Sequence, residues 1–237
     1  MKYIEKHTVS SQYTDCNGIL KAGALLRYMQ EAACNSMEAD GRSYEDLASD
    51  GLIFVLSKIT LSIYSDIRAN DDIEVETWAC EGQRYSHLRC YRVTRGGMCM
   101  AEASSVWALV NKATHRLVRV TDAALPFRTD DLLDLEVLQK IPLPVDMSLV
   151  GERNVCYSDI DRNMHMNNTV YADMICDYAF AKSPAKVSRI SISYLNEAPF
   201  GEVLKVYRSA MDDTVYIKTV RTDNKTNIEA EIICENM

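Results

Sequence analysis

The sequence predicts an α+β protein made of two copies of one unit, in which a long helix is followed by an antiparallel sheet that wraps around it. Two observations support this prediction. Each half of the chain begins with an apolar pattern of helical period and continues with segments in which apolar and polar residues alternate. Strand segments of the two halves also match each other at a constant offset. The order of one helix and then several strands differs from the alternating order of a doubly wound fold.

The internal duplication is clearest in one pair of strand segments. Residues 57–63, Ser-Lys-Ile-Thr-Leu-Ser-Ile, match residues 188–194, Ser-Arg-Ile-Ser-Ile-Ser-Tyr, position by position at an offset of 131 (188 − 57). Upstream of the helices, residues 13–15 resemble residues 157–159 at an offset of 144 (157 − 13). The difference between the two offsets predicts a longer connection from helix to strand in the first half.

Each half has one predicted helix. The first is expected over residues 20–40, because apolar side chains recur there on one face and Gly41 offers a stop. Its inner stripe consists of Leu25, Met29, Ala33 and Met37. The second helix is expected to start near Asn168 and to end before Pro184, since proline disfavours helix in the residue before it. Its inner stripe consists of Val170, Met174, Tyr178 and Ala181.

Four strands are predicted after each helix, because apolar and polar residues alternate there between turn-forming residues. In the first half they cover residues 54–64, 73–80, 88–94 and 99–111. In the second half they cover residues 187–195, 203–209, 215–221 and 228–234. Turns are expected at Gly96-Gly97, Asp212-Asp213 and Asp223-Asn224.

Prolines between the two sets of elements predict a linker, which contains Pro126, Pro142 and Pro144. The predicted organisation is therefore an N-terminal unit over residues 1–125, a linker over residues 126–152 and a C-terminal unit over residues 153–237. Exposed sheet edges in such units permit a homodimer without requiring one.

Composition and charge exclude several classes of protein. The 237 residues carry a net charge of −8, with 34 acidic against 26 basic residues, which argues against a nucleic-acid-binding protein because that role needs a basic surface. The first residues contain no apolar signal segment, and no apolar run is long enough to span a bilayer. We therefore expect a cytoplasmic protein. The eight cysteines include no C-x-x-C pair, so we expect reduced and mostly buried thiols.

A dense polar cluster stands immediately before the second predicted helix. Residues 159–168 read Asp-Ile-Asp-Arg-Asn-Met-His-Met-Asn-Asn. The cluster begins like a calcium loop, but Met164 and Val170 occupy the positions where an EF-hand needs Gly and a bidentate acid, so calcium is rejected. Helix capping is a second reading, in which Asn167 or Asn168 bonds the first free amides of the helix.

Capping does not account for His165. Because Asn163 and Asp161 precede it by two and four residues, His165 is a candidate for acid–base chemistry. A serine nucleophile is not indicated, since residues 41–45 lack the second glycine of a G-x-S-x-G elbow. Cys156 is the nearest cysteine and stays a weak candidate nucleophile, because it is expected in a strand.

Four segments resemble the acyl-ACP thioesterase family of plants and bacteria. Residues 158–171 are similar to its D-x-N-x-H-[VM]-N-N signature. Residues 103–112 resemble its central strand, residues 72–78 the strand before it, and residues 26–32 its first helix. The similarity touches nearly the whole chain. It implies a tandem hot-dog fold, the hydrolysis of a fatty acyl thioester on acyl carrier protein, and no cofactor or metal.

The resemblance also implies the site residues. The signature places Asp161, Asn163 and His165 in the active site. The family's Y-x-x-E-C element aligns with residues 194–198, so Glu197 takes the place of the catalytic acid. Ala198 stands where the family has cysteine, a departure that removes a covalent nucleophile and favours attack by an activated water. Glu197, alone or with His165, would be the base for that water.

Several alternatives stay open at this point. An acyl-CoA thioesterase of the same fold and a non-catalytic acyl-binding module fit the same residues. If the substrate is an acidic carrier protein, a local basic surface is needed. One candidate surface consists of Arg84, Arg89, Arg92 and Arg95. A second consists of Lys112, Arg116 and Arg119. The first half has no histidine in its corresponding loop, so it is expected to shape the acyl site without catalysing.

Overall fold

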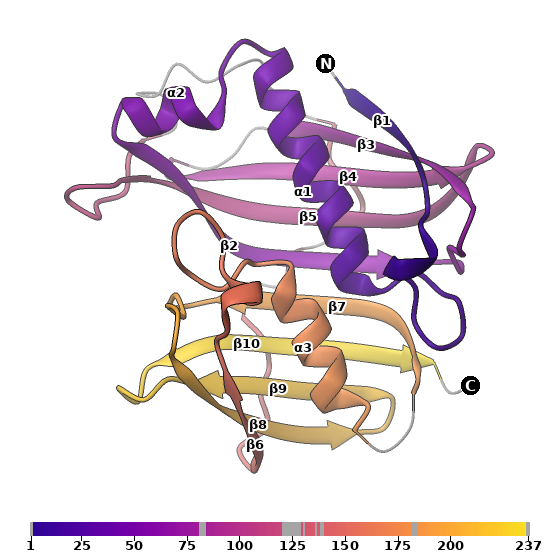
Figure 1. The fold of residues 1–237 in the computed structure, drawn as a ribbon, viewed down its shortest axis with the longest axis vertical. Coiled ribbons are helices and arrows are strands. Elements are labelled where there is room, and N and C mark those ends of the chain that lie inside the picture. Colours follow the sequence, from indigo (N-terminus) through magenta and orange to yellow (C-terminus); the bar gives the residue numbers. More distant parts are fainter. Residues whose placement is uncertain are drawn as a thin grey trace. The chain divides into compact units, whose positions relative to one another are not determined.

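The computed structural model describes residues 2–80, 84–119, 129, 131–135, 137, 140–181 and 184–235. The chain divides into two compact units, Met1–Val137 and Leu138–Met237. In each unit a helix lies across one face of an antiparallel sheet (Figure 1), which confirms the predicted α+β class. No helix in the described ranges combines the length and the apolar character that crossing a membrane would need.

The first unit forms a five-stranded sheet in the order β1-β3-β4-β5-β2, and each neighbouring pair is antiparallel. Its strands are β1 (Tyr3–Thr8), β2 (Leu52–Ile63), β3 (Asp72–Cys80), β4 (Ser86–Arg95) and β5 (Met98–Asn111). Its helices are the short η1 (Ser11–Tyr13), α1 (Ala22–Ala39) and α2 (Tyr44–Ser49). Leu25 and Met29 of α1 are almost completely buried, as are Ile73 and Val75 of β3, so helix and sheet share one core.

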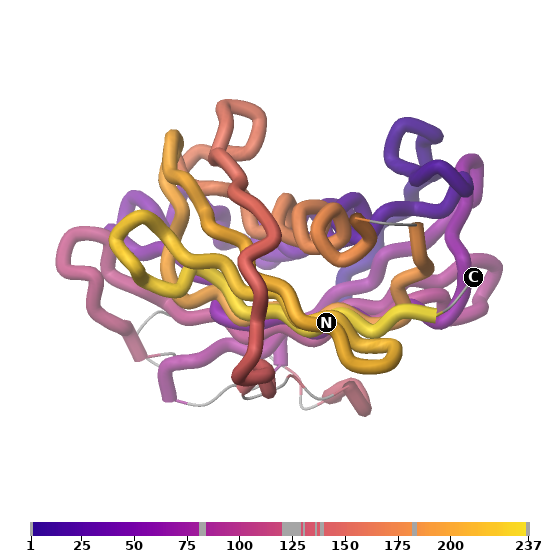
Figure 2. Tube along the Cα trace, turned by 90° about the horizontal axis from the view of Figure 1, so that it is seen from below, coloured from indigo at the N-terminus to yellow at the C-terminus, as the bar shows by residue number. Residues whose placement is uncertain are grey.

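The second unit repeats this plan with the strand order β7-β10-β9-β8-β6, again with antiparallel neighbours. Its strands are β6 (Ser148–Asn154), β7 (Lys186–Tyr194), β8 (Val203–Met211), β9 (Thr214–Val220) and β10 (Thr226–Glu235). Its helices are η3 (Tyr157–Asp159) and α3 (Val170–Ala179). Seen end-on in Figure 2, α3 lies on one side of the strands of its own unit.

Both long helices and all eight predicted strands are confirmed, with ends that differ by a few residues. The structure adds β1, α2 and β6. The last five residues of the predicted linker, 148–152, lie in β6, which pairs with β8 at the sheet edge. Strands β1 and β6 were missed because edge strands can carry charged residues on the exposed face instead of a clear apolar alternation.

Two sequence expectations about burial are wrong. Of the predicted stripe of α3, Met174 is buried, Val170 and Tyr178 are half-buried, and Ala181 is exposed and lies beyond the helix, whereas Tyr171 and Ile175, which were not predicted, are buried. The cysteines are all free thiols, but only Cys80 and Cys90 are buried. Exposed positions are held by Cys16, Cys34 and Cys156.

The two units also correct the alignment of the loops before the helices. An isolated bridge joins Thr14 to Leu20 in the first unit, and its equivalent joins Ile160 to Met166 in the second, at an offset of 146 (166 − 20) and not 144. Ile19 therefore occupies the place of His165 (165 − 19 = 146). The offset of 131 still holds for the segments that follow β2 and β7. Ile19 is bridged to Arg68 and His165 to Pro199, and these partners are 131 positions apart (199 − 68).

Candidate active site

The loop between η3 and α3 carries the predicted Asp161, Asn163 and His165. It is a tight turn in which the Asp161 amide donates to the His165 carbonyl at 3.0 Å and the Met164 amide donates to the Asp161 carbonyl at 3.0 Å. Met164 adopts a φ of 65°, a left-handed conformation that is uncommon outside glycine and asparagine. The turn places the histidine side by side with the chain segment that follows β7.

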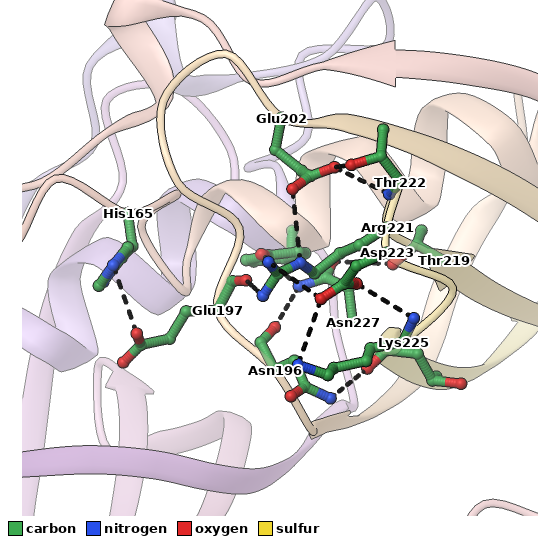
Figure 3. Close-up of polar contacts among 12 residues, drawn as sticks. His165, Asn196, Glu197, Glu202, Thr219, Arg221, Thr222, Asp223, Lys225 and Asn227 are labelled. Atoms are coloured by element: carbon green, nitrogen blue, oxygen red, sulfur yellow. Dashed lines mark hydrogen bonds and ion pairs between the residues drawn. The ribbon is translucent and has the colours of Figure 1, made fainter. Parts of the chain in front are cut away.

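That neighbouring segment carries Glu197. The Met166 amide donates to the Ala198 carbonyl at 2.8 Å, and an isolated bridge joins His165 to Pro199. Across this pairing, His165 Nε2 lies 3.3 Å from Glu197 Oε2, as Figure 3 shows. The histidine side chain is 34% exposed and the glutamate side chain 56% exposed. The structure thus brings together two predicted site residues in a position where both can exchange protons with a bound molecule.

The Asp161 carboxylate organises Asn163. Asp161 Oδ1 accepts from the Asn163 amide at 2.8 Å, and Asp161 Oδ2 lies 3.4 Å from Asn163 Nδ2. Asp161 reaches His165 through its backbone amide. Among the described contacts, the Asp161 carboxylate therefore holds Asn163 directly, whereas Asp161 is joined to His165 through the main chain.

The remaining polar residues of the cluster shape the loop. Asp159 is buried, accepts from the Cys156 amide at 2.7 Å and pairs with Arg153 at 2.6 Å. Asn167 Oδ1 accepts from both the amide and the hydroxyl of Thr169 at 2.9 Å. Because Thr169 is the N-cap of α3, the Asn167 side chain bonds the residue before the helix, while the Asn167 carbonyl accepts from the amide of Val170, the first helical residue, at 2.9 Å. The Asn168 carbonyl accepts from the Tyr194 hydroxyl at 2.9 Å.

Neither residue considered as a nucleophile fits that role. Cys156 is exposed at the start of η3 and not in a strand, and in the described part of the chain no hydrogen bond joins it to His165. Its Sγ lies 3.5 Å from the Asn154 carbonyl oxygen. Ala198 is completely buried and contributes its carbonyl to the pairing with Met166.

The corresponding loop of the first unit has the same backbone and lacks the histidine. Asp15 Oδ1 accepts from the Asn17 amide at 2.8 Å, and the Asp15 amide donates to the Ile19 carbonyl at 2.7 Å, as Asp161 does in the second unit. Asp66 stands in the place of Glu197 (197 − 66 = 131), and it pairs with Arg68 at 2.8 Å. Among the described residues, the close histidine–glutamate pair is therefore a feature of the second unit.

Sequence reasoning missed the polar residues beneath Glu197. Asn227 is completely buried, and its side-chain amide donates to the Asn196 carbonyl at 2.5 Å and to the Tyr171 hydroxyl at 3.0 Å. Burial raises the pKa of Tyr171 to about 12, so its hydroxyl stays protonated at neutral pH. The available signal was an asparagine at the start of a strand whose other buried positions are apolar, where an unpaired amide would be costly.

The two predicted basic surfaces differ in exposure, because Arg89, Arg92 and Arg95 of the first are half-buried. Arg92 pairs with Glu102 at 2.7 Å and Arg95 with Asp71 at 2.5 Å, while Arg89 donates to the Thr77 hydroxyl at 3.1 Å. The second surface lies in the turn after β5, where every member is exposed, namely Lys112, Arg116 and Arg119. Within the described ranges, no three His, Cys, Asp or Glu side chains are grouped to hold a metal ion.

The fold defines a tandem hot-dog protein. It matches the crystal structure of an acyl-ACP thioesterase from Bacteroides thetaiotaomicron with a TM-score of 0.87 and 21% identity, over 99% of this chain and 98% of that one. It also matches a 12:0-ACP thioesterase from Umbellularia californica with a TM-score of 0.84 and 17% identity, over 100% of this chain and 98% of that one.

The family is shown by its domain models. The acyl-ACP thioesterase N-terminal domain matches residues 1–126, and the acyl-ACP thioesterase C-terminal domain matches residues 144–235. The chain belongs to the acyl-ACP thioesterase family, as its resemblance implied.

Individual relatives agree with this assignment. Oleoyl-acyl carrier protein thioesterase 2 of Arabidopsis thaliana is 26% identical over 74% of this chain and 53% of its own length. A palmitoyl-acyl carrier protein thioesterase of Gossypium hirsutum is 24% identical over 90% of this chain and 54% of its own length. The chain therefore spans about half the length of these curated relatives.

Proposed function

We propose that this protein hydrolyses fatty acyl thioesters carried on acyl carrier protein, with the reaction at His165 and Glu197. One observation carries the proposal: in a chain of this family, the imidazole and carboxylate lie 3.3 Å apart on two paired loops of the second unit. A base and a proton donor at such a distance can act on one bound water or carbonyl group.

The proposed reaction is a direct attack by water. Glu197, alone or with His165, takes a proton from water while the water oxygen adds to the thioester carbonyl carbon. The carbon–sulfur bond then breaks, the proton passes to the departing thiolate, and a free fatty acid and the carrier thiol are released. Buried Ala198 cannot form a covalent intermediate, which favours water as the nucleophile.

In this proposal the Asn163 side-chain amide polarises the thioester carbonyl. The amides of Thr169 and Val170, at the start of α3, are already bonded to Asn167. We therefore assign the stabilisation of the oxyanion to the Asn163 side-chain amide and not to these two helix amides; Asp161 holds the Asn163 backbone. Losing one such donor costs roughly 2.7–4 kcal/mol of transition-state stabilisation in enzymes that use them.

Matched aspartate variants test whether only the second unit is catalytic. Asp161→Ala and Asp15→Ala each remove the same bond from a carboxylate to the amide two residues on. Each is expected to lower the free energy of unfolding by about 1 kcal/mol or somewhat more, since Asp15 Oδ1 also accepts from the Ile19 amide at 3.0 Å. Only Asp161→Ala should lower kcat, by about tenfold or more, because its turn carries Asn163 and His165. A comparable loss of kcat in a folded Asp15→Ala variant would contradict the assignment.

Carrier-protein docking is assigned to the second surface, because all of its members are exposed whereas three of the four arginines of the first are half-buried. Reversing two charges with Lys112→Glu and Arg116→Glu is expected to raise KM for an acyl-ACP thioester and to flatten its dependence on salt. The control is the pair Lys140→Glu and Lys205→Glu, two exposed lysines whose reversal changes the net charge equally. Equal effects of both pairs on KM would show that only net charge matters.

The experiment that tests the proposed substrate compares carriers. One acyl chain is presented on acyl carrier protein and on coenzyme A, and kcat/KM is measured for each. Preferential hydrolysis on the protein carrier supports the proposal. Preference for coenzyme A would instead identify an acyl-CoA thioesterase, and retention of fatty acid without turnover would identify an acyl-binding module.

A further inference from the structure

A buried polar network lies directly under the loop that carries Glu197. Asn227 sits at its centre: its side-chain oxygen accepts from the Thr219 hydroxyl at 2.8 Å, and its amide donates to the Asn196 carbonyl and to the Tyr171 hydroxyl. Its carbonyl accepts from the amides of Leu195 and Asn196 at 2.9 and 3.1 Å. Asn227 thus bonds both the backbone amide and the backbone carbonyl of Asn196, the residue before Glu197, as Figure 3 shows in part.

The network also reaches the histidine loop. Tyr171 lies in the first turn of α3, five residues after Met166, and its ring packs edge-on against Tyr194 at 5.5 Å. The Tyr194 hydroxyl donates to the Asn168 carbonyl, in the segment that joins His165 to α3. The two loops that carry His165 and Glu197 are therefore tied to one buried set of side chains.

The first unit provides an internal comparison, because its backbone makes the same bonds. Met100 accepts from the amides of Tyr64 and Ser65, as Asn227 does from Leu195 and Asn196, so Met100 is the counterpart of Asn227. Val93 is the counterpart of Thr219. In the first unit Arg92 pairs with Glu102 and Val93 is the next residue, while in the second unit Lys218 pairs with the equivalent Glu229 and Thr219 is the next residue. Leu25 is the counterpart of Tyr171, five residues after its own bridge residue Leu20 (25 − 20).

All three counterparts are apolar and almost completely buried. The fold can therefore be built with Leu25, Val93 and Met100 in place of Tyr171, Thr219 and Asn227. A second arrangement is shared by both units. Arg221 donates to the Glu197 carbonyl at 3.0 Å and pairs with Glu202, while Arg95 donates to the Asp66 carbonyl at 3.4 Å and pairs with Asp71.

The arginine arrangement occurs in both units and is therefore part of their common architecture. The asparagine network occurs in the second unit, which also carries His165 and Glu197. Buried amides are favourable only when fully bonded, and a bonded network fixes one geometry more strictly than apolar packing does. We infer that Asn227, supported by Tyr171 and Thr219, is a positioning residue that fixes the Glu197 loop opposite His165. The inference rests on the proposed function and extends it to the buried residues beneath the His165–Glu197 pair.

The test converts the second unit's network to the first unit's residues. Asn227→Met alone, and the triple variant Tyr171→Leu, Thr219→Val and Asn227→Met, are compared with the wild-type chain. Both are expected to lower kcat about 10- to 100-fold, because a displacement of about 1 Å at a catalytic group has effects of this size. KM should change by less than about threefold, since the three substituted side chains are buried and the exposed side chains of the site keep their identity.

The triple variant separates positioning from stability. It replaces the whole network by packing that the first unit already uses, so its Tm is expected to equal or exceed that of Asn227→Met while its kcat stays low. The control is Ser188→Ala, which removes a side-chain bond to the Ile233 carbonyl between β7 and β10 and should leave kcat unchanged. A folded triple variant with wild-type kcat would overturn the inference.

A crystal structure of the triple variant gives a readout that does not need activity. The expected result is that the 3.3 Å approach of His165 Nε2 to Glu197 Oε2 is lost, with the rest of the unit unchanged. An unchanged approach would overturn the positioning role even if the wild-type chain hydrolysed no thioester. Inactivity of the wild-type chain would instead count against the proposed function alone.

Discussion

Glu197→Gln is expected to lower kcat for an acyl-ACP thioester about 10²- to 10⁴-fold, the range that a positioned general base contributes. Glutamine keeps the size of the side chain and its hydrogen bonding but cannot accept the proton of the attacking water. Because the Glu197 side chain is 56% exposed, the substitution should leave the free energy of unfolding within about 0.5 kcal/mol of wild type. The measurement is kcat from thiol release, together with thermal unfolding.

Glu235 offers a matched control for this variant. Its side chain is also 56% exposed and also lies in an ion pair, 3.1 Å from Lys186. Glu235→Gln therefore makes the same chemical change in the same unit, away from the histidine loop. It is expected to keep wild-type kcat. If Glu197→Gln stayed within twofold of the control, another group would have to activate the water.

His165→Gln is expected to produce the second large loss, about 100-fold in kcat, because the imidazole faces the carboxylate at 3.3 Å. The double variant with Glu197→Gln distinguishes a working pair from two independent residues. Residues that act as one unit give losses that do not multiply, so the double variant should be no more than a few-fold slower than the worse single variant. Fully multiplicative losses would mean that the two side chains contribute to separate steps.

Much of the fold could be predicted from the sequence because the duplicated units repeat a clear pattern. Helical spacing around Leu25 and Met29 and alternation along β2 and β7 are local signals, and each element formed where its pattern indicated. Strands β1 and β6 lie at sheet edges, where one face meets solvent and charged residues replace the apolar alternation. Their assignment depends on pairing with β3 and β8, which only the folded chain provides.

The sequence predicted the candidate site residues, but it did not predict the contacts that hold them in place. The motif around His165 and the element around Glu197 were found by resemblance, and the structure brings these two side chains together. What joins them is the pairing of Met166 with Ala198, a backbone contact that has no signature in the residue types. Asn227 is 62 positions from His165 in the sequence (227 − 165), so its role under Glu197 emerges only when β10 lies beside the end of β7.

The central claim is that the second unit hydrolyses fatty acyl thioesters on acyl carrier protein. The most direct measurement is the release of free thiol from a panel of acyl-ACP thioesters of different chain length, with wild-type protein and with Glu197→Gln. Turnover by wild type on at least one chain, with most of that rate lost in a folded Glu197→Gln variant, is the predicted result. Absence of release from every chain, or equal release by the variant, would contradict it.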